Sequence, residues 1–81
     1  MVIKLNNLGS SNIESINYNE SEQLLFVEFH SGGVYKYSGV PREVFDAMSN
    51  AESVGKAFHN LIRKGGYAYE KVGDSIDTMN V

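Results

Sequence analysis

The clearest pattern in the first part of the chain is a run of strand-forming residues in which apolar side chains recur at every second position on one face, the period of a β-strand. This run is followed by Gly32-Gly33, which can supply the positive φ angles of a tight turn. The pattern predicts a β-hairpin over Leu25–Gly39. The apolar residues on one face of its first strand are Leu25, Val27 and Phe29.

The period changes to that of a helix after Pro41. Pro41 fits the start of a short helix that ends near Asn50, and Ser53 is the predicted N-cap of a second helix running to about Lys64, with Gly65 just past its end. The apolar stripes of the two helices are Val44, Phe45 and Met48, then Val54, Ala57, Phe58, Leu61 and Ile62.

Three further segments are candidate strands. Val2–Leu5 is a short apolar run that fits an edge strand or an arm, and Ile13–Tyr18 is a weak strand whose isoleucines do not alternate, which indicates a bulge or a late start. Residues 67–72 alternate and form a candidate last strand. Strands that precede helices are typical of an α+β fold. We expect a small antiparallel β-meander of three to four strands with two α-helices packed on one face.

The chain divides into three expected parts: an N-terminal arm or edge strand over 1–10, one domain over 11–72, and an acidic, flexible tail over 73–81. Eighty-one residues leave no room for a second core. The start lacks the features of a signal peptide and no apolar run is long enough to cross a membrane, so a cytoplasmic location is expected.

Charge and residue inventory exclude several function classes. The net charge of −3 gives no global attraction to phosphate, although a local basic face remains open. The absence of cysteine excludes disulfides and thiolate metal sites. His30 and His59 lack partners at metal-ligand spacing, and no Gly-x-Ser-x-Gly elbow holds a serine nucleophile. We therefore expect no enzymatic activity, no metal and no cofactor.

The first candidate binding feature is aromatic. Tyr35-Lys36-Tyr37 and the pair Tyr67 and Tyr69 each place two rings on one face of a strand. Exposed aromatic rings beside lysine stack the bases of single-stranded nucleic acids. The alternative is that the tyrosines pack in the core as good strand formers.

The register of the hairpin determines which face Tyr35 and Tyr37 occupy. A two-residue Gly32-Gly33 loop places Tyr35 opposite His30, away from the core. A three-residue loop that includes Ser31 places Tyr35 opposite Phe29 and Tyr37 opposite Val27, in the core layer. The three-residue loop is favoured, because otherwise residues 34, 36 and 38 would have to complete the core face.

The second candidate feature is the polar face of the second helix. Lys56, His59 and Arg63 lie at spacing i, i+3, i+7, and Lys64 is adjacent. They indicate either an anion-facing stripe, which Lys71 could extend, or an ordinary solvated face whose last cations complement the helix dipole.

The ordered set of these residues resembles the KTSC domain, a family named for its occurrence at the C-terminus of some lysyl-tRNA synthetases. The resemblance runs from about Ser11 to Lys71. The matching residues are Leu25, Val27, Phe29, Gly33, Tyr35, Tyr37, Gly39, Val40, Pro41, Ser53, Gly55, Phe58, Ile62 and Arg63.

This resemblance implies a domain without established function, for which RNA binding is suggested by the synthetase context. The sequence thus predicts a non-enzymatic binding module for RNA or single-stranded nucleic acid. The rival hypothesis is a small protein-interaction or inhibitor module of the stand-alone bacterial or phage-encoded kind, self-associating or with a protein partner through Val2–Leu5. The candidate binding residues are Tyr35, Lys36, Tyr37, Lys56, His59, Arg63, Lys64, Tyr67 and Tyr69.

Overall fold

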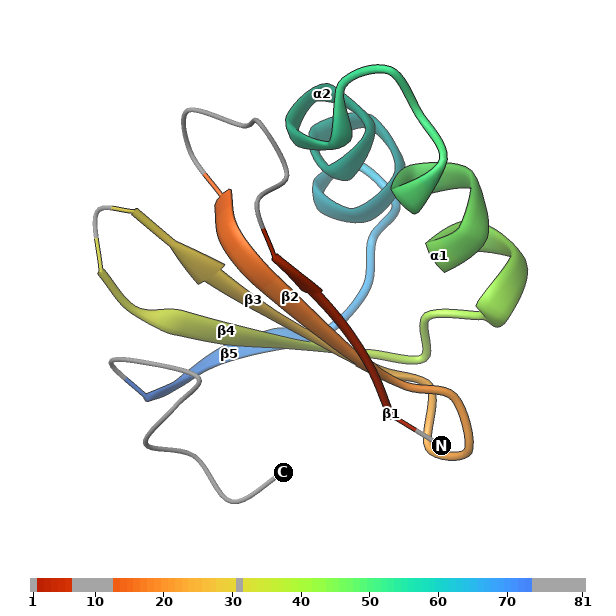
Figure 1. The fold of residues 1–81 in the computed structure, drawn as a ribbon. Coiled ribbons are helices and arrows are strands. Elements are labelled where there is room, and N and C mark those ends of the chain that lie inside the picture. The colour runs from red at the N-terminus through yellow and green to blue at the C-terminus, as the bar shows by residue number, and fades with distance from the viewer. Residues whose placement is uncertain (1, 7–12, 31, 74–81) are drawn as a thin grey trace.

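The computed structural model describes residues 2–6, 13–30 and 32–73. They form a five-stranded antiparallel sheet in the order β1-β2-β3-β4-β5, with the helical segments between β4 and β5 (Figure 1). The elements are β1 (Val2–Asn6), β2 (Ile13–Asn19), β3 (Leu24–Phe29), β4 (Val34–Ser38), α1 (Arg42–Ser49), α2 (Val54–Phe58), the π-helix η1 (His59–Arg63) and β5 (Tyr69–Gly73).

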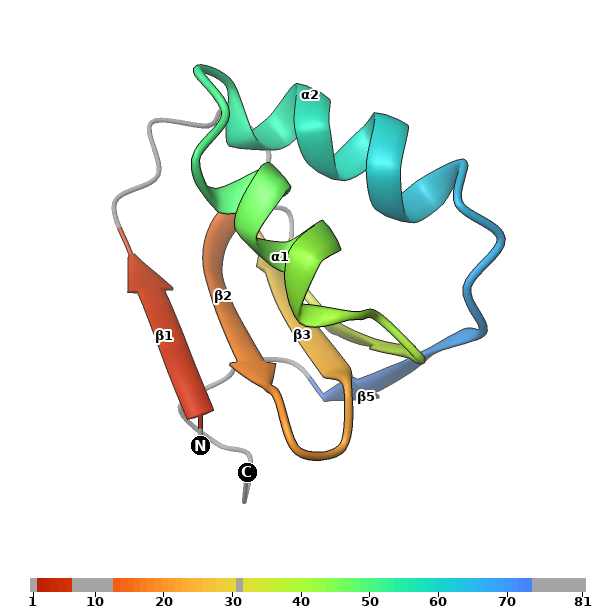
Figure 2. The same ribbon diagram turned by 90° about the vertical axis from the view of Figure 1, so that its right-hand side faces the viewer.

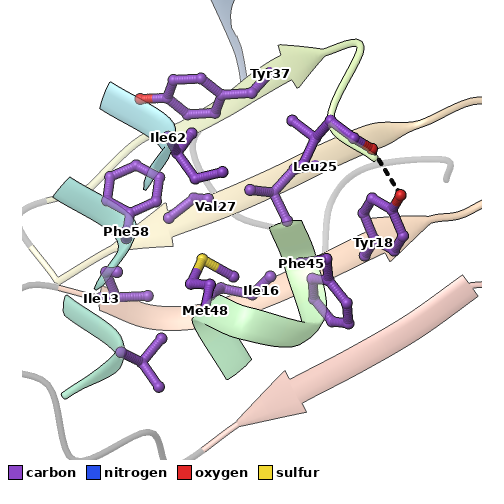
Figure 3. Close-up of a cluster of buried hydrophobic side chains, with 12 residues drawn as sticks. Ile13, Ile16, Tyr18, Leu25, Val27, Tyr37, Phe45, Met48, Phe58 and Ile62 are labelled. Atoms are coloured by element: carbon purple, nitrogen blue, oxygen red, sulfur yellow. Dashed lines mark hydrogen bonds between the residues drawn. The ribbon is translucent and has the colours of Figure 1, made fainter. Parts of the chain in front are cut away.

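The helices lie together on one face of the sheet (Figure 2). Between the two layers is the main hydrophobic core, in which Ile16 and Val27 from the sheet and Met48 from α1 are fully buried. Figure 3 shows this cluster, with Tyr37 and Phe58 in one part of it and Tyr18 and Phe45 in another. One sheet face therefore carries the core and the helices.

The expected α+β class, an antiparallel meander with helices on one face, is confirmed. The sheet has five strands rather than three or four, because Val2–Asn6 pairs with β2 and Tyr69–Gly73 pairs with β4. The irregularity expected in the second strand is a register shift between Ile13 and Ser15. The predicted acidic tail lies, beyond Gly73, outside the described residues.

The β3–β4 register differs from both predicted alternatives. Tyr35 pairs with Val27 and Tyr37 pairs with Leu25, and the Phe29 N–H donates to the Gly33 carbonyl at 3.2 Å. In the favoured three-residue loop His30 and Val34 would flank the turn, whereas in the structure Phe29 and Gly33 flank it. The shift changes the partner of every residue but preserves the face, so both tyrosines lie on the core side as that alternative predicted.

The second predicted helix forms as two consecutive pieces. The Ser53 hydroxyl caps it by accepting from the Lys56 N–H at 3.3 Å, as its sequence position predicted. α2 then passes into η1, where the Lys64 N–H donates to the His59 carbonyl at 3.1 Å. This i→i+5 bond accommodates one more residue in the turn than an α-helix does. Gly66, not Gly65, takes the positive φ of +80° after the helix.

Tyr18 joins the sheet to the segment that leads into α1. Its ring stacks on Phe45 with centroids 4.5 Å apart, and its hydroxyl donates to the Val40 carbonyl at 2.6 Å (Figure 3). Burial, and then the charge of nearby Glu20, raises the pKa of the Tyr18 phenol, so the folded protein favours the neutral donor. This hydrogen bond fixes where the chain leaves the sheet.

Replacing Tyr18 with phenylalanine is expected to lower the free energy of unfolding by about 1–2 kcal/mol, because the buried Val40 carbonyl loses its donor while the ring stacking is kept. Urea denaturation measures the loss. Ser21→Ala is the matched control, since it removes an exposed hydroxyl that bonds only Asn19, and it should change little. Equal stability of Tyr18→Phe and the parent would show that this bond contributes nothing.

Candidate binding site

A hollow of about 450 Å³ opens between η1 and the strands β4 and β5, on the helix-bearing side of the sheet. Its volume lies within the range of small-ligand pockets. It is lined by Phe29, Gly32, Tyr35, Tyr37, Arg63 and Tyr69. Four of these six residues are among the binding residues predicted from the sequence, and they come from three separate elements.

The rings of the hollow form a connected aromatic surface. Tyr37 and Tyr69 are opposite each other on β4 and β5 and stack with centroids 5.4 Å apart. Tyr35 lies 6.4 Å from Tyr69, with the two ring planes tilted by 49°. Tyr37 is buried and Tyr35 half-buried, whereas 66% of Tyr69 is exposed. Tyr69 therefore offers a ring to a ligand while its neighbours hold it in place.

Phe58 packs against this aromatic surface from the hydrophobic core. It makes an edge-to-face contact with Tyr37, at 5.4 Å between centroids (Figure 3). A second edge-to-face contact joins it to Phe29, at 5.7 Å between centroids. Phe29 in turn contacts Tyr35 edge to face at 5.7 Å. The tyrosines thus both complete the core and line the hollow, so the two predicted roles for Tyr35 and Tyr37 are not exclusive.

Arg63 supplies the positive charge of the hollow. Burial raises the pKa of the Tyr37 phenol, the Arg63 guanidinium lowers it in part, and the Tyr69 and Tyr35 phenols add to the rise. Arg63 therefore acts electrostatically on the phenol that is most deeply placed in the aromatic cluster. Among the described residues, no carboxylate forms an ion pair with Arg63.

The loop after η1 depends on Gly65. A Cβ at this position would lie 2.4 Å from the Leu61 carbonyl oxygen and 2.8 Å from the Tyr67 ring. Tyr67 is half-buried and packs against the main core, and it does not line the hollow. Because Gly65 has no side chain, the backbone can pass close to Leu61 and the Tyr67 ring before the chain enters β5 at Tyr69.

The structure separates the other predicted residues from the hollow. Lys36 alternates with the two tyrosines along β4, so it lies on the opposite face, where its Nζ is 3.0 Å from the Glu70 carboxylate. Lys56, His59 and Lys64 are exposed on the helical segment, and none of them lines the hollow. Of the predicted stripe, Arg63 alone is part of the hollow.

Two lining residues were absent from the prediction, Phe29 and Gly32. The alternation of β3 already placed Phe29 on the core face, and the favoured three-residue loop placed it directly opposite Tyr35. In the observed register Tyr35 pairs with Val27, and Phe29 reaches the Tyr35 ring diagonally. Gly32 has φ +98°, and apart from its chain neighbours no atom of the described residues lies within 4 Å of its Cβ position, so it contributes open space at the turn. Identifying it required the turn geometry, which the two adjacent glycines leave ambiguous.

The described ranges hold no cluster of three or more His, Asp or Glu side chains suited to a metal ion. Within the same part of the chain, none of the helices has the length and apolar character needed to span a membrane.

Comparison with known proteins identifies the family. The KTSC domain model matches residues 9–69. An uncharacterized protein of Stutzerimonas stutzeri is 38% identical over 65 residues, which cover 80% of this chain and 92% of that protein. A lysine–tRNA ligase of Trichormus variabilis is 42% identical over 60 residues, which cover 74% of this chain but only 10% of the ligase.

A solved structure agrees with the sequence matches. The crystal structure of a KTSC domain protein from Yersinia pestis superposes with a TM-score of 0.79 at 32% identity, over 90% of this chain and 100% of that chain. The family model spans most of the chain, and the expected resemblance is confirmed at the level of both sequence and fold. The chain belongs to the KTSC domain family.

Proposed function

We propose that this domain binds single-stranded RNA, with one unpaired base stacked on Tyr69 in the hollow between η1 and β5. The observation that carries the proposal is that one hollow of about 450 Å³ holds an exposed, stacked tyrosine and an arginine that has no acidic partner among the described residues. Aromatic side chains stack unpaired bases at about 1–3 kcal/mol per base. Arginine binds phosphate through several donors and also stacks on flat rings.

The distribution of charge supports an anionic ligand at this place in spite of the acidic chain. Lys36 and Arg42 are neutralised by ion pairs with Glu70, Asp46 and Glu20. The basic side chains of η1 and β5, by contrast, have no ion pair within the described residues. Charge that can attract phosphate is therefore available beside the hollow, as it is on the exposed Lys56 and Lys64 of the helical segment.

The relatives give the proposal a biological context. Lysine–tRNA ligases from three cyanobacterial strains contain a segment 39–42% identical to this chain. By their name these enzymes act on an RNA. An RNA-binding role for the shared domain is consistent with this setting.

The test is a titration of the protein with a single-stranded hexaribonucleotide, followed by amide NMR shifts. We expect the shifts to cluster on β4, η1 and β5. Tyr69→Ala should weaken binding about 5- to 150-fold, the equivalent of one lost base stack. Arg63→Gln should weaken it as well and reduce the dependence of affinity on salt, by about 0.7 log units per log unit of salt for one phosphate contact.

Two control variants separate the hollow from general electrostatic attraction. Arg42→Gln removes the same charge from a side chain outside the hollow and should leave the affinity almost unchanged. Lys56→Gln removes one positive charge from the part of the predicted helical stripe that is outside the hollow. If Lys56→Gln and Arg63→Gln weaken binding equally, the RNA binds along the stripe and not in the hollow. Absence of any shift at low salt would exclude RNA binding altogether.

A further inference from the structure

We propose that Lys71 is a second phosphate-binding residue of the hollow, so that the site takes an internal nucleotide with a phosphate on each side. This inference rests on the proposed function and deepens it. A nucleotide within a strand carries both a 5′ and a 3′ phosphate, whereas a free nucleotide most often carries phosphate at one position only. A site with cations on two sides of the base platform distinguishes these ligands.

The position of Lys71 follows from the sheet register. Lys71 pairs with Tyr35 and Tyr69 pairs with Tyr37, so Lys71 and Tyr69 lie on the same face of β5. Residues two apart on a strand are separated by about 6.6 Å. Lys71 is thus one step along the strand from the exposed ring and on the same side of the sheet as the hollow.

The side chain of Lys71 extends over Gly33, next to the lining residues Gly32 and Tyr35, although Lys71 itself does not line the hollow. Its Cε lies 3.1 Å and its Nζ 3.7 Å from the position that a Cβ at Gly33 would occupy, with the Tyr35 ring 3.6 Å from the same point. Gly33 has φ +95° and no side chain, and this leaves room for the lysine to cross the turn. The ammonium group therefore lies beside Tyr35, which lines the hollow.

Among the residues that the structure describes, no acidic side chain forms an ion pair with Lys71. The nearest acidic residue of β5, Glu70, forms an ion pair with Lys36 instead, on the face of the sheet opposite to the hollow. Lys71 and Glu70 are adjacent on β5, so alternation directs them to opposite faces. The charge of Lys71 remains available on the side where the tyrosines lie.

The two cations approach the hollow from different layers. Arg63 comes from η1 in the helix layer, and Lys71 comes from β5 in the sheet. Arg63 lines the hollow itself, and Lys71 lies beside Tyr35 at its edge, so a base stacked on Tyr69 would have the two cations at different positions around it. Each cation then contacts one of the two phosphates of an internal nucleotide, which explains why one aromatic platform carries two separate unpaired charges.

The test compares three probes by NMR titration: adenosine 5′-monophosphate, adenosine 3′-monophosphate and adenosine 3′,5′-bisphosphate. The bisphosphate should bind about two- to fivefold more tightly than either monophosphate, the size of one exposed charge contact. Lys71→Gln should reduce the affinity for the bisphosphate to that for one monophosphate, and Arg63→Gln should reduce it to that for the other. Lys71→Arg should retain the preference.

Arg42→Gln, with the same loss of charge outside the hollow, should leave the ranking of the three probes unchanged. Equal affinity of the parent protein for all three probes, or a uniform loss for all three in Lys71→Gln, would overturn the role of Lys71. If the hexaribonucleotide binds through Tyr69 and Arg63 while Lys71→Gln has no effect, this inference fails and the proposed function stands. If neither RNA nor any probe binds, both fail.

Discussion

Replacing Phe58 with alanine is expected to lower the free energy of unfolding by about 3–5 kcal/mol, the usual cost of removing a buried phenylalanine ring. The ring is 3% exposed and contacts Phe29 and Tyr37 edge to face. A domain of this length is stable by about 4–12 kcal/mol in total. Urea denaturation should therefore show a large fall in the midpoint, or a partly unfolded protein without denaturant.

Phe58→Leu gives a variant that keeps an apolar side chain in the same place. It should fold with a smaller loss of stability, but Phe29 and Tyr37 lose the ring against which they pack, so the hollow should bind RNA less well. Lys56→Ala, on the exposed side of the same helix, should change stability by less than about 0.5 kcal/mol. A stability of Phe58→Ala within that margin would show that Phe58 does not support the core.

Gly65→Ala is expected to cost up to about 3 kcal/mol, although it adds a single methyl group to an exposed position. The new Cβ would lie 2.4 Å from a backbone oxygen, that of Leu61, and this atom cannot move without distorting η1. The adjacent Tyr67 ring would also be displaced, and with it the approach of the chain to Tyr69. Thermal denaturation should show a lower melting temperature.

The matched control for Gly65→Ala is Lys64→Ala, one residue earlier at the same helix end. Its side chain is exposed and lines no cavity, so its replacement should leave the melting temperature nearly unchanged. RNA binding provides a second measurement, since a displaced β5 should weaken the affinity of Gly65→Ala even below its melting temperature. A parent-like melting temperature would mean that the loop relaxes to accept the methyl group.

The fold was largely predictable because its elements follow local patterns. Alternation defined the hairpin, helical spacing defined both helical segments, and Pro41 and Ser53 marked their starts. The register was not predictable, because Gly32 and Gly33 both adopt positive φ and either can close the turn. Hydrogen bonding between Phe29 and Gly33 decided between them, and no local pattern encodes that choice.

The candidate site was predictable residue by residue but not as an assembly. Tyr35, Tyr37, Arg63 and Tyr69 each came from a local pattern, yet their meeting depends on the geometry of η1 and on the pairing of β4 with β5. Lys36 is different. Simple alternation along the strand separates it from the neighbouring tyrosines, so its place on the opposite face could have been inferred from the sequence.

The pairing of β4 with β5 also has a consequence for the order of folding. The other pairings join strands that follow one another directly along the chain, whereas β4 and β5 enclose all the helical segments. Closing this longer loop costs more chain entropy, so β5 should dock after the first four strands have formed. The hollow is then the last part of the molecule to be assembled and the first to be lost by local unfolding. A ligand that holds η1 and β5 together would stabilise that edge by an amount that grows with the logarithm of its concentration once the site is saturated.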